Sequence, residues 1–339
     1  MAHEIDESTG KAAFAHVGAK GWHGLGQQLT EDATLDTWRV EAGMDWSVKE
    51  TDVLYKVIDG EGNVNEKAMA DRRLLFRSDT HSALSIVSDD YKIVQPREVL
   101  EFFRDLTESR GFTMETAGVL FGGRKFWALA KAGDSVKLLG EDEVKPYLLI
   151  ATSVDGSMST VAHFTSVRVV CNNTLRMSVG GNNDSMIKVP HNAIVNPDLV
   201  KAQLGLAAQS WDEFVGNISL LANRKIDYDF AIQTVADELK AANKIKMVNA
   251  DGTPYTHSEL VESSTVLRRI MRLYNGEGLG AQYKSSNGTA WGLVNAVTQF
   301  ADHEAGAKKE DKSRAFERAH LTDWAKFKVN VADRLLEAA

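Results

Sequence analysis

The chain of 339 residues has a single cysteine, Cys171, only five prolines and no long hydrophobic run. One cysteine excludes an intramolecular disulfide and a zinc site built from several cysteines, and it fits a reducing compartment. No apolar run approaches the ~20 residues that a membrane-spanning helix needs. Residues 1–10 lack the apolar core of a secretory signal. We therefore expect a cytoplasmic protein that is not inserted in a membrane.

The charge balance limits the kinds of partner that the whole surface can attract. The formal net charge is −8 at pH 7, whereas a protein that coats duplex nucleic acid is more often basic overall. Any nucleic-acid surface must therefore be a local patch on an acidic body. Hydrophobic residues make up 43% of the chain, which is enough for a globular core.

The hydrophobic pattern changes from strand-like to helical after Pro197. The sequence therefore predicts an α+β protein. Its first half is expected to hold an antiparallel, hairpin-built sheet with packed helices, and its second half to be mostly α-helical. We expect a glycine-rich arm with a short helix over residues 1–43, a sheet domain over 44–195 and a helical region over 196–339.

The strongest local signal is a β-hairpin. Two β-rich runs, Thr113–Phe121 and Arg124–Lys131, flank Gly122-Gly123, a two-residue turn that tolerates the positive φ angles of a tight hairpin. This register places Gly118 opposite Trp127, so that the smallest side chain leaves room for the largest.

Other segments have the periodicity of one element each. The expected strands are 44–58, Leu74–Phe76, Leu84–Val87 and a hairpin from Tyr147 to Thr165 that turns at Asp155-Gly156. The expected helices are Thr34–Ala42, Pro96–Ser109, a short helix capped within Asn172–Thr174 and running to Met177, and, in the second half, helices over Trp211–Leu221, Tyr228–Leu239, Leu260–Tyr274, one from Thr289, and Trp324–Leu336.

Five short sequence words occur in a characteristic order along nearly the whole chain. They are Trp22-His23-Gly24-Leu25-Gly26, Gly122-Gly123-Arg124, Asp155-Gly156-Ser157, the run Arg168–Leu175 with Asn173 and Thr174, and the run Gly288–Thr298 with Trp291 and Asn295. Together they resemble the phage/plasmid-like protein family of prophages, phages and plasmids. The resemblance implies a mobile-element gene, and it brings no catalytic residues with it.

Three groups of residues have both an enzymatic and a structural interpretation. Cys171 would be a nucleophile if His163 activated it, but its apolar neighbours favour a core cysteine. The nine histidines show no metal-ligand spacing, although His23, His163 and His191 would form a site if they converged. The glycine loop over 276–280 follows a helix, which favours a connector over a phosphate loop. We expect no cofactor and no metal, and the balance is against an enzyme.

Acidic residues are absent from residues 116–133 and 156–183. Cations and aromatic rings alternate there, as binding of a single strand requires, because phosphates pair with the cations and bases stack on the rings. The predicted nucleic-acid-binding residues are Arg124, Lys125, Trp127, Lys131, Arg168 and Arg176. The alternative is that these aromatic residues are ordinary strand residues and that the cations pair with acids from elsewhere.

The sequence thus predicts a single-stranded DNA-binding or strand-annealing protein of mobile-element recombination or replication. The order of hairpins followed by helices is similar to that of phage single-strand annealing proteins, which is an analogy of fold order alone. Because such proteins usually work as rings or filaments, we expect homo-oligomers. The alternative is a protein-interaction module, such as a counter-defence factor that acts on a host protein, and the sequence leaves the two open.

Overall fold

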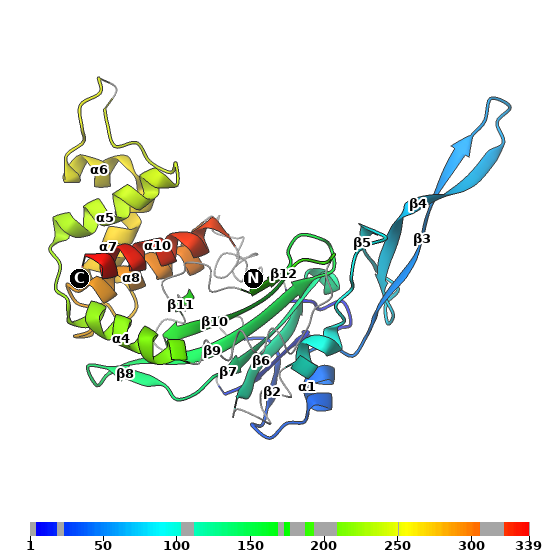
Figure 1. The fold of residues 1–339 in the computed structure, drawn as a ribbon, viewed down its shortest axis with the longest axis horizontal. Helices are drawn as coiled ribbons and strands as arrows, with labels where there is room; N and C mark the ends of the chain where they lie inside the picture. The colour runs from blue at the N-terminus through cyan, green and yellow to red at the C-terminus, as the bar shows by residue number, and fades with distance from the viewer. Residues whose placement is uncertain are drawn as a thin grey trace.

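The computed structural model describes residues 5–18, 24–102, 112–168, 173–176, 187–192, 209–249, 251–305 and 322–338. Strands are concentrated in the first half of the chain and helices in the second (Figure 1). This arrangement confirms the predicted α+β class. No helix in the described part of the chain is long and apolar enough to cross a bilayer.

Within the described residues, nine strands form the main sheet. They are β1 (Phe14–Val17), β2 (Gln27–Leu29), β6 (Thr113–Leu120), β7 (Lys125–Lys131), β8 (Val136–Leu138), β9 (Asp142–Ser153), β10 (Thr160–Arg168), β11 (Asn173–Arg176) and β12 (Ile187–Val189). The order is β11-β10-β9-β7-β6-β1-β2, with β8 beside β9 and β12 beside β10. Every pairing is antiparallel except that of β1 with β2.

The β6–β7 hairpin has the predicted register, because Gly118 lies directly opposite Trp127. Its turn is longer than the predicted two residues. Phe121 leaves the strand, and Phe121, Gly122 and Gly123 all have positive φ angles, of 56°, 67° and 102°. At Gly123 a Cβ atom would lie 3.0 Å from the side chain of Arg77, so the turn needs glycine there.

Two predicted helices are wrong. The short helix expected after Asn172 is replaced, over residues 173–176, by β11, which pairs with β10 and so satisfies its backbone groups through a sheet ladder. The single helix expected over Leu260–Tyr274 is two helices, α6 (His257–Ser263) and α7 (Thr265–Arg272). Ser264 separates them in an extended conformation, and its side chain accepts the Leu267 N–H as the N-cap of α7.

The predicted glycine-rich arm contains β1 and the edge strand β2 of the main sheet. The Asp6 N–H donates to the Val119 carbonyl oxygen at 2.9 Å, and Ile5 bridges to Leu120. The described part of the arm is therefore docked on the sheet. Trp22 and His23 lie outside the described residues, and Gly24 has a φ of 69°.

The other predicted helices are confirmed where the structure describes them. They are α1 (Leu35–Glu41), a helix over 96–102, α4 (Gln209–Asn223), α5 (Tyr228–Ala241), α8 (Ala290–Gln299) and α10 (Asp323–Glu337). Residues 103–109 of the expected helix lie outside the described part. Two short π-helical turns, η2 (Leu273–Glu277) and η3 (Phe300–Glu304), follow α7 and α8.

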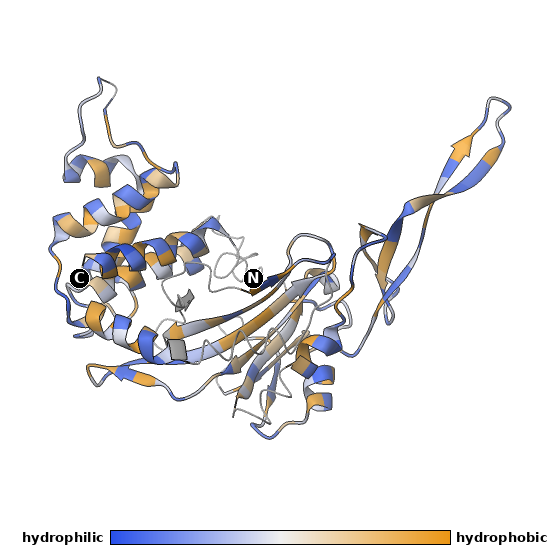
Figure 2. Ribbon diagram, in the orientation of Figure 1, coloured by the Kyte–Doolittle hydropathy of each residue, from blue (hydrophilic) through white to orange (hydrophobic). Residues whose placement is uncertain are grey.

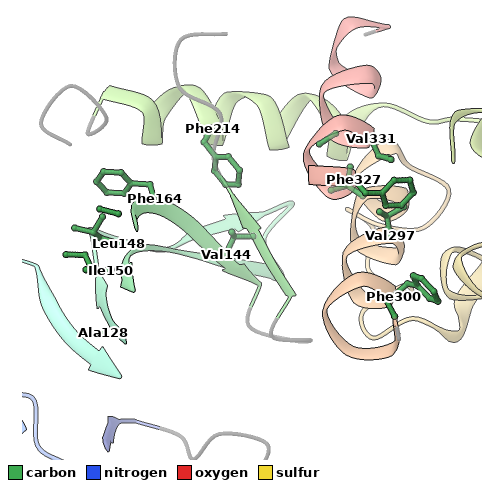
Figure 3. Packing of buried hydrophobic residues seen from close by; sticks show 14 of the residues in the cluster. Ala128, Val144, Leu148, Ile150, Phe164, Phe214, Val297, Phe300, Phe327 and Val331 are labelled. Atoms are coloured by element: carbon green, nitrogen blue, oxygen red, sulfur yellow. The ribbon is translucent and has the colours of Figure 1, made fainter. Parts of the chain in front are cut away.

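One face of the main sheet belongs to the hydrophobic core. Phe126, Ala128 and Ala130 of β7 point to this face and are fully buried. Figure 3 shows Phe214 of α4 approaching Phe164 of β10 on the same side. The core continues between α8 and α10, so the sheet and the helical half share one hydrophobic cluster.

A buried carboxylate joins the sheet to the helices. Asp142 begins β9 and is fully buried, and its Oδ2 accepts hydrogen bonds from Ser285 Oγ at 2.7 Å and from Trp291 Nε1 at 3.0 Å. Asn295, one turn along α8, donates to the Trp291 carbonyl oxygen at 2.9 Å. Two residues of the recognised sequence words, Trp291 and Asn295, therefore have structural roles.

We predict that Asp142→Ala destabilises the protein by about 2–4 kcal/mol, because two buried donors lose their acceptor. Urea unfolding followed by fluorescence measures this loss. Asp134→Ala, which removes an exposed carboxylate, is the control and is expected to change stability by less than about 0.5 kcal/mol. Equal stability of Asp142→Ala and the wild type would contradict the role of this junction.

A second sheet forms a ribbon that projects from the body (Figure 1). Its strands are β3 (Val48–Ile58), β4 (Val64–Arg77) and β5 (Ala83–Ser88), in that order. Because β5 pairs only with residues 72–76 of β4, the outer part of the ribbon has two strands. Figure 2 shows hydrophobic residues, coloured orange, along much of this exposed outer part.

Arg77 anchors the ribbon to the body. Its guanidinium is 2% exposed, donates to Asp6 and, at 2.9 and 2.7 Å, to the two oxygens of Asp79. It also lies 4.3 Å from the centroid of the Trp46 ring, a cation–π contact. Burial lowers the pKa of Arg77, but the hydrogen bonds and charges of Asp79 and Asp6 outweigh it, so the pKa is raised and the guanidinium stays charged.

Candidate nucleic-acid interface

The face of the main sheet opposite the core, which we name the polar face, carries most of the predicted site. Residues alternate between the two faces along a strand, so Lys125, Trp127, Leu129 and Lys131 of β7 share this face. Strand β7 therefore brings three of the six predicted binding residues onto this face.

Cross-strand pairing extends this surface across the sheet. Lys131 lies opposite Tyr147 of β9, Tyr147 opposite Thr165 of β10, and Thr165 opposite position 176 of β11. Lys145, two residues before Tyr147 on β9, lies on the same face and is half-buried. The row thus gathers basic positions from β7, β9 and β11.

Arg168 does not join this row. It pairs with Val144 of β9, which is fully buried and belongs to the core face of the sheet. The register therefore separates position 168 from the other predicted binding residues. Proximity in sequence to Arg176 placed both in one acid-free stretch, but strand alternation assigns them to opposite faces.

Lys125 is held at the base of the hairpin turn. It is 8% exposed, and its Nζ lies 4.9 Å from the centroid of the Phe121 ring. Burial raises the pKa of Asp155, but hydrogen bonds from Ser157 and the charge of Lys125 outweigh it, so that this pKa is lowered. The neighbouring Arg124 is exposed at the surface of the turn.

Trp127 packs within a small cluster on the polar face. It is half-buried beside Ala151 and Val161, and its ring lies 5.9 Å from that of Phe14, at an interplanar angle of 43°. The paired Gly118 has no side chain, and a Cβ there would lie 2.9 Å from the Ala13 carbonyl oxygen. Only part of the indole is therefore available to a stacking base.

The middle of the polar face is buried and polar. His16, His163 and Thr165 are all nearly inaccessible to solvent. The Tyr147 hydroxyl donates to Glu115 Oε1 at 2.8 Å, and burial, followed by the charge of Glu115, raises the pKa of Tyr147 well above its usual value. The accessible cations thus flank this buried centre and do not line it.

The described residues do not show the arrangement of side chains that the enzymatic interpretations require. Among them, no group of three histidine, cysteine or acidic side chains is placed to hold a metal ion. His191 stacks on Tyr91 at 4.5 Å, and its two ring nitrogens lie 3.1 Å from the carbonyl oxygens of Lys92 and Met158, so it connects loops. His23 and Cys171 lie outside the described part of the chain.

The glycine loop over 276–280 begins in the π-helical turn η2. Glu277 in this loop accepts hydrogen bonds from Arg269 and, at 2.7 Å, from Arg272. Arg269 also pairs with Glu304 through two hydrogen bonds of 2.6 and 2.9 Å. These ion pairs tie the loop to α7, and through Arg269 to η3.

A cavity in the helical half was not predicted from the sequence. Its volume is about 370 Å³, and its lining includes Tyr228, Tyr274, Asn275, Gln282 and Asn287. The Tyr274 hydroxyl is buried with no hydrogen-bond partner among the described residues. Both tyrosines belong to helical stripes of apolar residues, so periodicity assigns them to the core and gives no signal of a cavity.

Burial, followed by the charge of Asp227, raises the pKa of Tyr274 to about 12. The folded state thus favours the neutral phenol more strongly than the unfolded state does, because a tyrosine in the unfolded chain ionises near pH ~10. This contribution to stability is complete below pH ~10 and is lost as the pH rises to about 12. We predict that Tyr274→Phe loses less stability than the wild type over this interval, measured by urea unfolding. Identical losses would contradict the burial of this hydroxyl.

No curated protein and no solved structure gives a significant match. Residues 83–321, which include β5 to β12 and the helices up to η3, match one family over more than half of the chain. The chain belongs to this family, which is described as a domain of unknown function (DUF932).

Proposed function

We propose that the protein binds single-stranded DNA along the polar face of the main sheet. The observation that carries the proposal is the cross-strand placement of Lys131, Lys145 and position 176 on one face of three strands. Neither Lys131 nor Lys145 is buried. The resemblance to phage/plasmid-like proteins supports a role in the recombination or replication of a mobile element, including strand annealing.

The spacing of these cations suits an extended strand that crosses the β-strands. Neighbouring strands lie ~4.8 Å apart, and diagonal neighbours on one face lie about 7–8 Å apart. Lys131 and Lys145 are diagonal neighbours, since Lys131 pairs with Tyr147. Consecutive phosphates would pair with cations from successive strands, while the accessible part of Trp127 offers a ring on which a base stacks.

This geometry changes which residues the test should address. Lys125 already contacts Phe121 and is buried, so its substitution would disturb the turn as well as the charge. Lys131 and Lys145 are the better probes because each is partly accessible and shares the polar face. Arg124, exposed at the turn, is a third cation within the same hairpin.

We predict that the double variant Lys131→Ala/Lys145→Ala binds a single-stranded oligonucleotide more weakly than the wild type. The slope of log affinity against log salt should fall in magnitude by ~1.4, because each of the two lost phosphate contacts contributes ~0.7. Fluorescence anisotropy over a series of salt concentrations measures both quantities.

Lys240→Ala is the matched control, since Lys240 is an exposed lysine of α5 in the helical half. It is expected to keep the wild-type slope. The proposal fails if the wild type shows no salt-dependent binding, or if the double variant and the control bind alike.

A protein partner is the second candidate function, and one observation favours it. The outer part of the ribbon exposes Leu54, Ile58 and Val64, which are 60%, 70% and 58% accessible. Large apolar side chains on a projecting element favour contact with another protein surface. The ribbon and the polar face are separate elements, so the two functions do not exclude one another.

A further inference from the structure

Among the described residues, no strand pairs with the edge of β3 that faces away from β4, and we call this the free edge. At its base, the side chain of Gln95 accepts the Val48 N–H at 2.8 Å and donates to the Val48 carbonyl oxygen at 3.1 Å. The backbone groups of Val48 thus point away from β4. Because this direction repeats every second residue, the even-numbered residues from Glu50 to Ile58 present their backbone groups to the same free edge.

The same alternation holds at the far end of β3, where the N–H of the odd-numbered Asp59 donates toward β4, to the Asn63 carbonyl oxygen at 3.0 Å. The irregularity of the ribbon lies in β4, where four residues, 69–72, face the single residue Val53. No proline interrupts β3 or β4. A long edge strand without such protection is a template for pairing with another strand, and a ribbon of two strands is only marginally stable alone.

We propose that the free edge of β3 pairs with β3 of a second copy of this chain, in antiparallel orientation and centred on Leu54. The two ribbons then form one continuous sheet across a two-fold axis, which is the commonest symmetry of homo-oligomers. The proposal does not depend on nucleic-acid binding.

The register follows from the length of the free edge. Val48 is already bonded to Gln95, so residues 50–58 remain, and their midpoint is Leu54. Complete antiparallel overlap aligns Leu54 with Leu54 of the second copy. The same alignment places Asp52 opposite Lys56 of the second copy, and it does so twice because of the symmetry.

Charges within each ribbon extend this complementarity. Asp52 pairs with Arg73 of β4, with an N–O distance of 3.8 Å, and Lys56 with Glu66, at 3.7 Å. In the proposed sheet, charges therefore alternate along one row from Arg73 through Asp52 to Lys56 and Glu66 of the second copy. Opposite charges directly across a sheet stabilise the pairing.

The central row of this face is apolar. Leu54 lies opposite Ala68 within its own ribbon, so the central row contains Ala68, Leu54 and the same two residues of the second copy. On the other face, Val53 aligns with Tyr55 of the second copy, a pairing of β-branched and aromatic side chains that favours sheets.

The charge of the ribbon disfavours nucleic acid as the occupant. Between Lys49 and Arg73 there are six acidic and five basic residues, so the ribbon offers no excess of positive charge to phosphates. A second ribbon, in contrast, supplies complementary charges and an equal free edge. The observations therefore favour self-association.

Charge-exchange variants test this register. Asp52→Lys alone and Lys56→Asp alone each place like charges opposite one another twice, and we expect each to self-associate about tenfold more weakly than the wild type. An equimolar mixture of the two variants restores both opposite-charge pairs, so the mixture should associate as the wild type does. Sedimentation velocity over a concentration series measures these affinities.

Lys67→Asp is the control for the charge exchange, because Lys67 is exposed on the other face of the ribbon, opposite Tyr55. It should leave association unchanged. Since all these positions are exposed, far-UV circular dichroism is expected to show a native fold for every variant. A monomeric wild type at all concentrations would overturn the proposal, as would single variants that associate normally or a mixture that does not recover.

Engineered cysteines test the centre of the pairing. Leu54→Cys should form an intermolecular disulfide under mild oxidation, because directly hydrogen-bonded residues lie about 5.5 Å apart, within the range for disulfides. Glu50→Cys should not, since the two copies of position 50 are eight residues apart along the strand. Both variants retain the native Cys171, so cross-linking of the wild type gives the background level for the comparison. Equal cross-linking of the two variants would contradict the register.

Discussion

Cross-strand register is the constraint on which the arrangement of this protein depends. In an antiparallel sheet, residues directly opposite one another share a face, and the face changes at every residue. One pairing, Lys131 with Tyr147, therefore determines the side of the sheet on which Lys145 lies. The same rule separates Arg168, opposite the buried Val144, from the cations of the polar face. It also determines which charges meet if two ribbons pair.

Buried charged side chains connect the elements that this register builds. Asp142 joins β9 to α8, and Arg77 joins the ribbon to the N-terminal segment and the β6–β7 turn. Lys328 of α10 and Asp302 of η3, both buried, pair at 2.6 Å. Removal of one partner from such a pair leaves an uncompensated buried charge, which is strongly destabilising. These contacts therefore hold distant segments in one arrangement, and the site residues keep their positions because the sheet does.

The sequence was sufficient for features that depend on local pattern. Alternation and the double glycine predicted the β6–β7 register, and apolar spacing predicted α4 and α5. Features that depend on tertiary contacts were not predictable: Asn173–Arg176 is a strand because β10 pairs with it, and Ser264 interrupts a helical stripe by capping α7. Lys145 was not among the predicted binding residues because acidic residues lie close to it in sequence, so its segment is not acid-free. The exposure of the ribbon was also not predictable. Its sequence pattern predicts strands, but it does not show that the outer part of the ribbon consists of two strands among the described residues.

The central claim is that one face of the main sheet contacts a single strand of DNA. Photo-cross-linking of a uniformly thymidine oligonucleotide to the intact protein, followed by mass spectrometry of the peptides, addresses this contact without any substitution. If DNA lies along the polar face, cross-links will be concentrated in β7 and β9, on peptides that contain Trp127, Lys131 or Tyr147. Cross-links confined to the ribbon or to the helical half, or none at low salt, would contradict it.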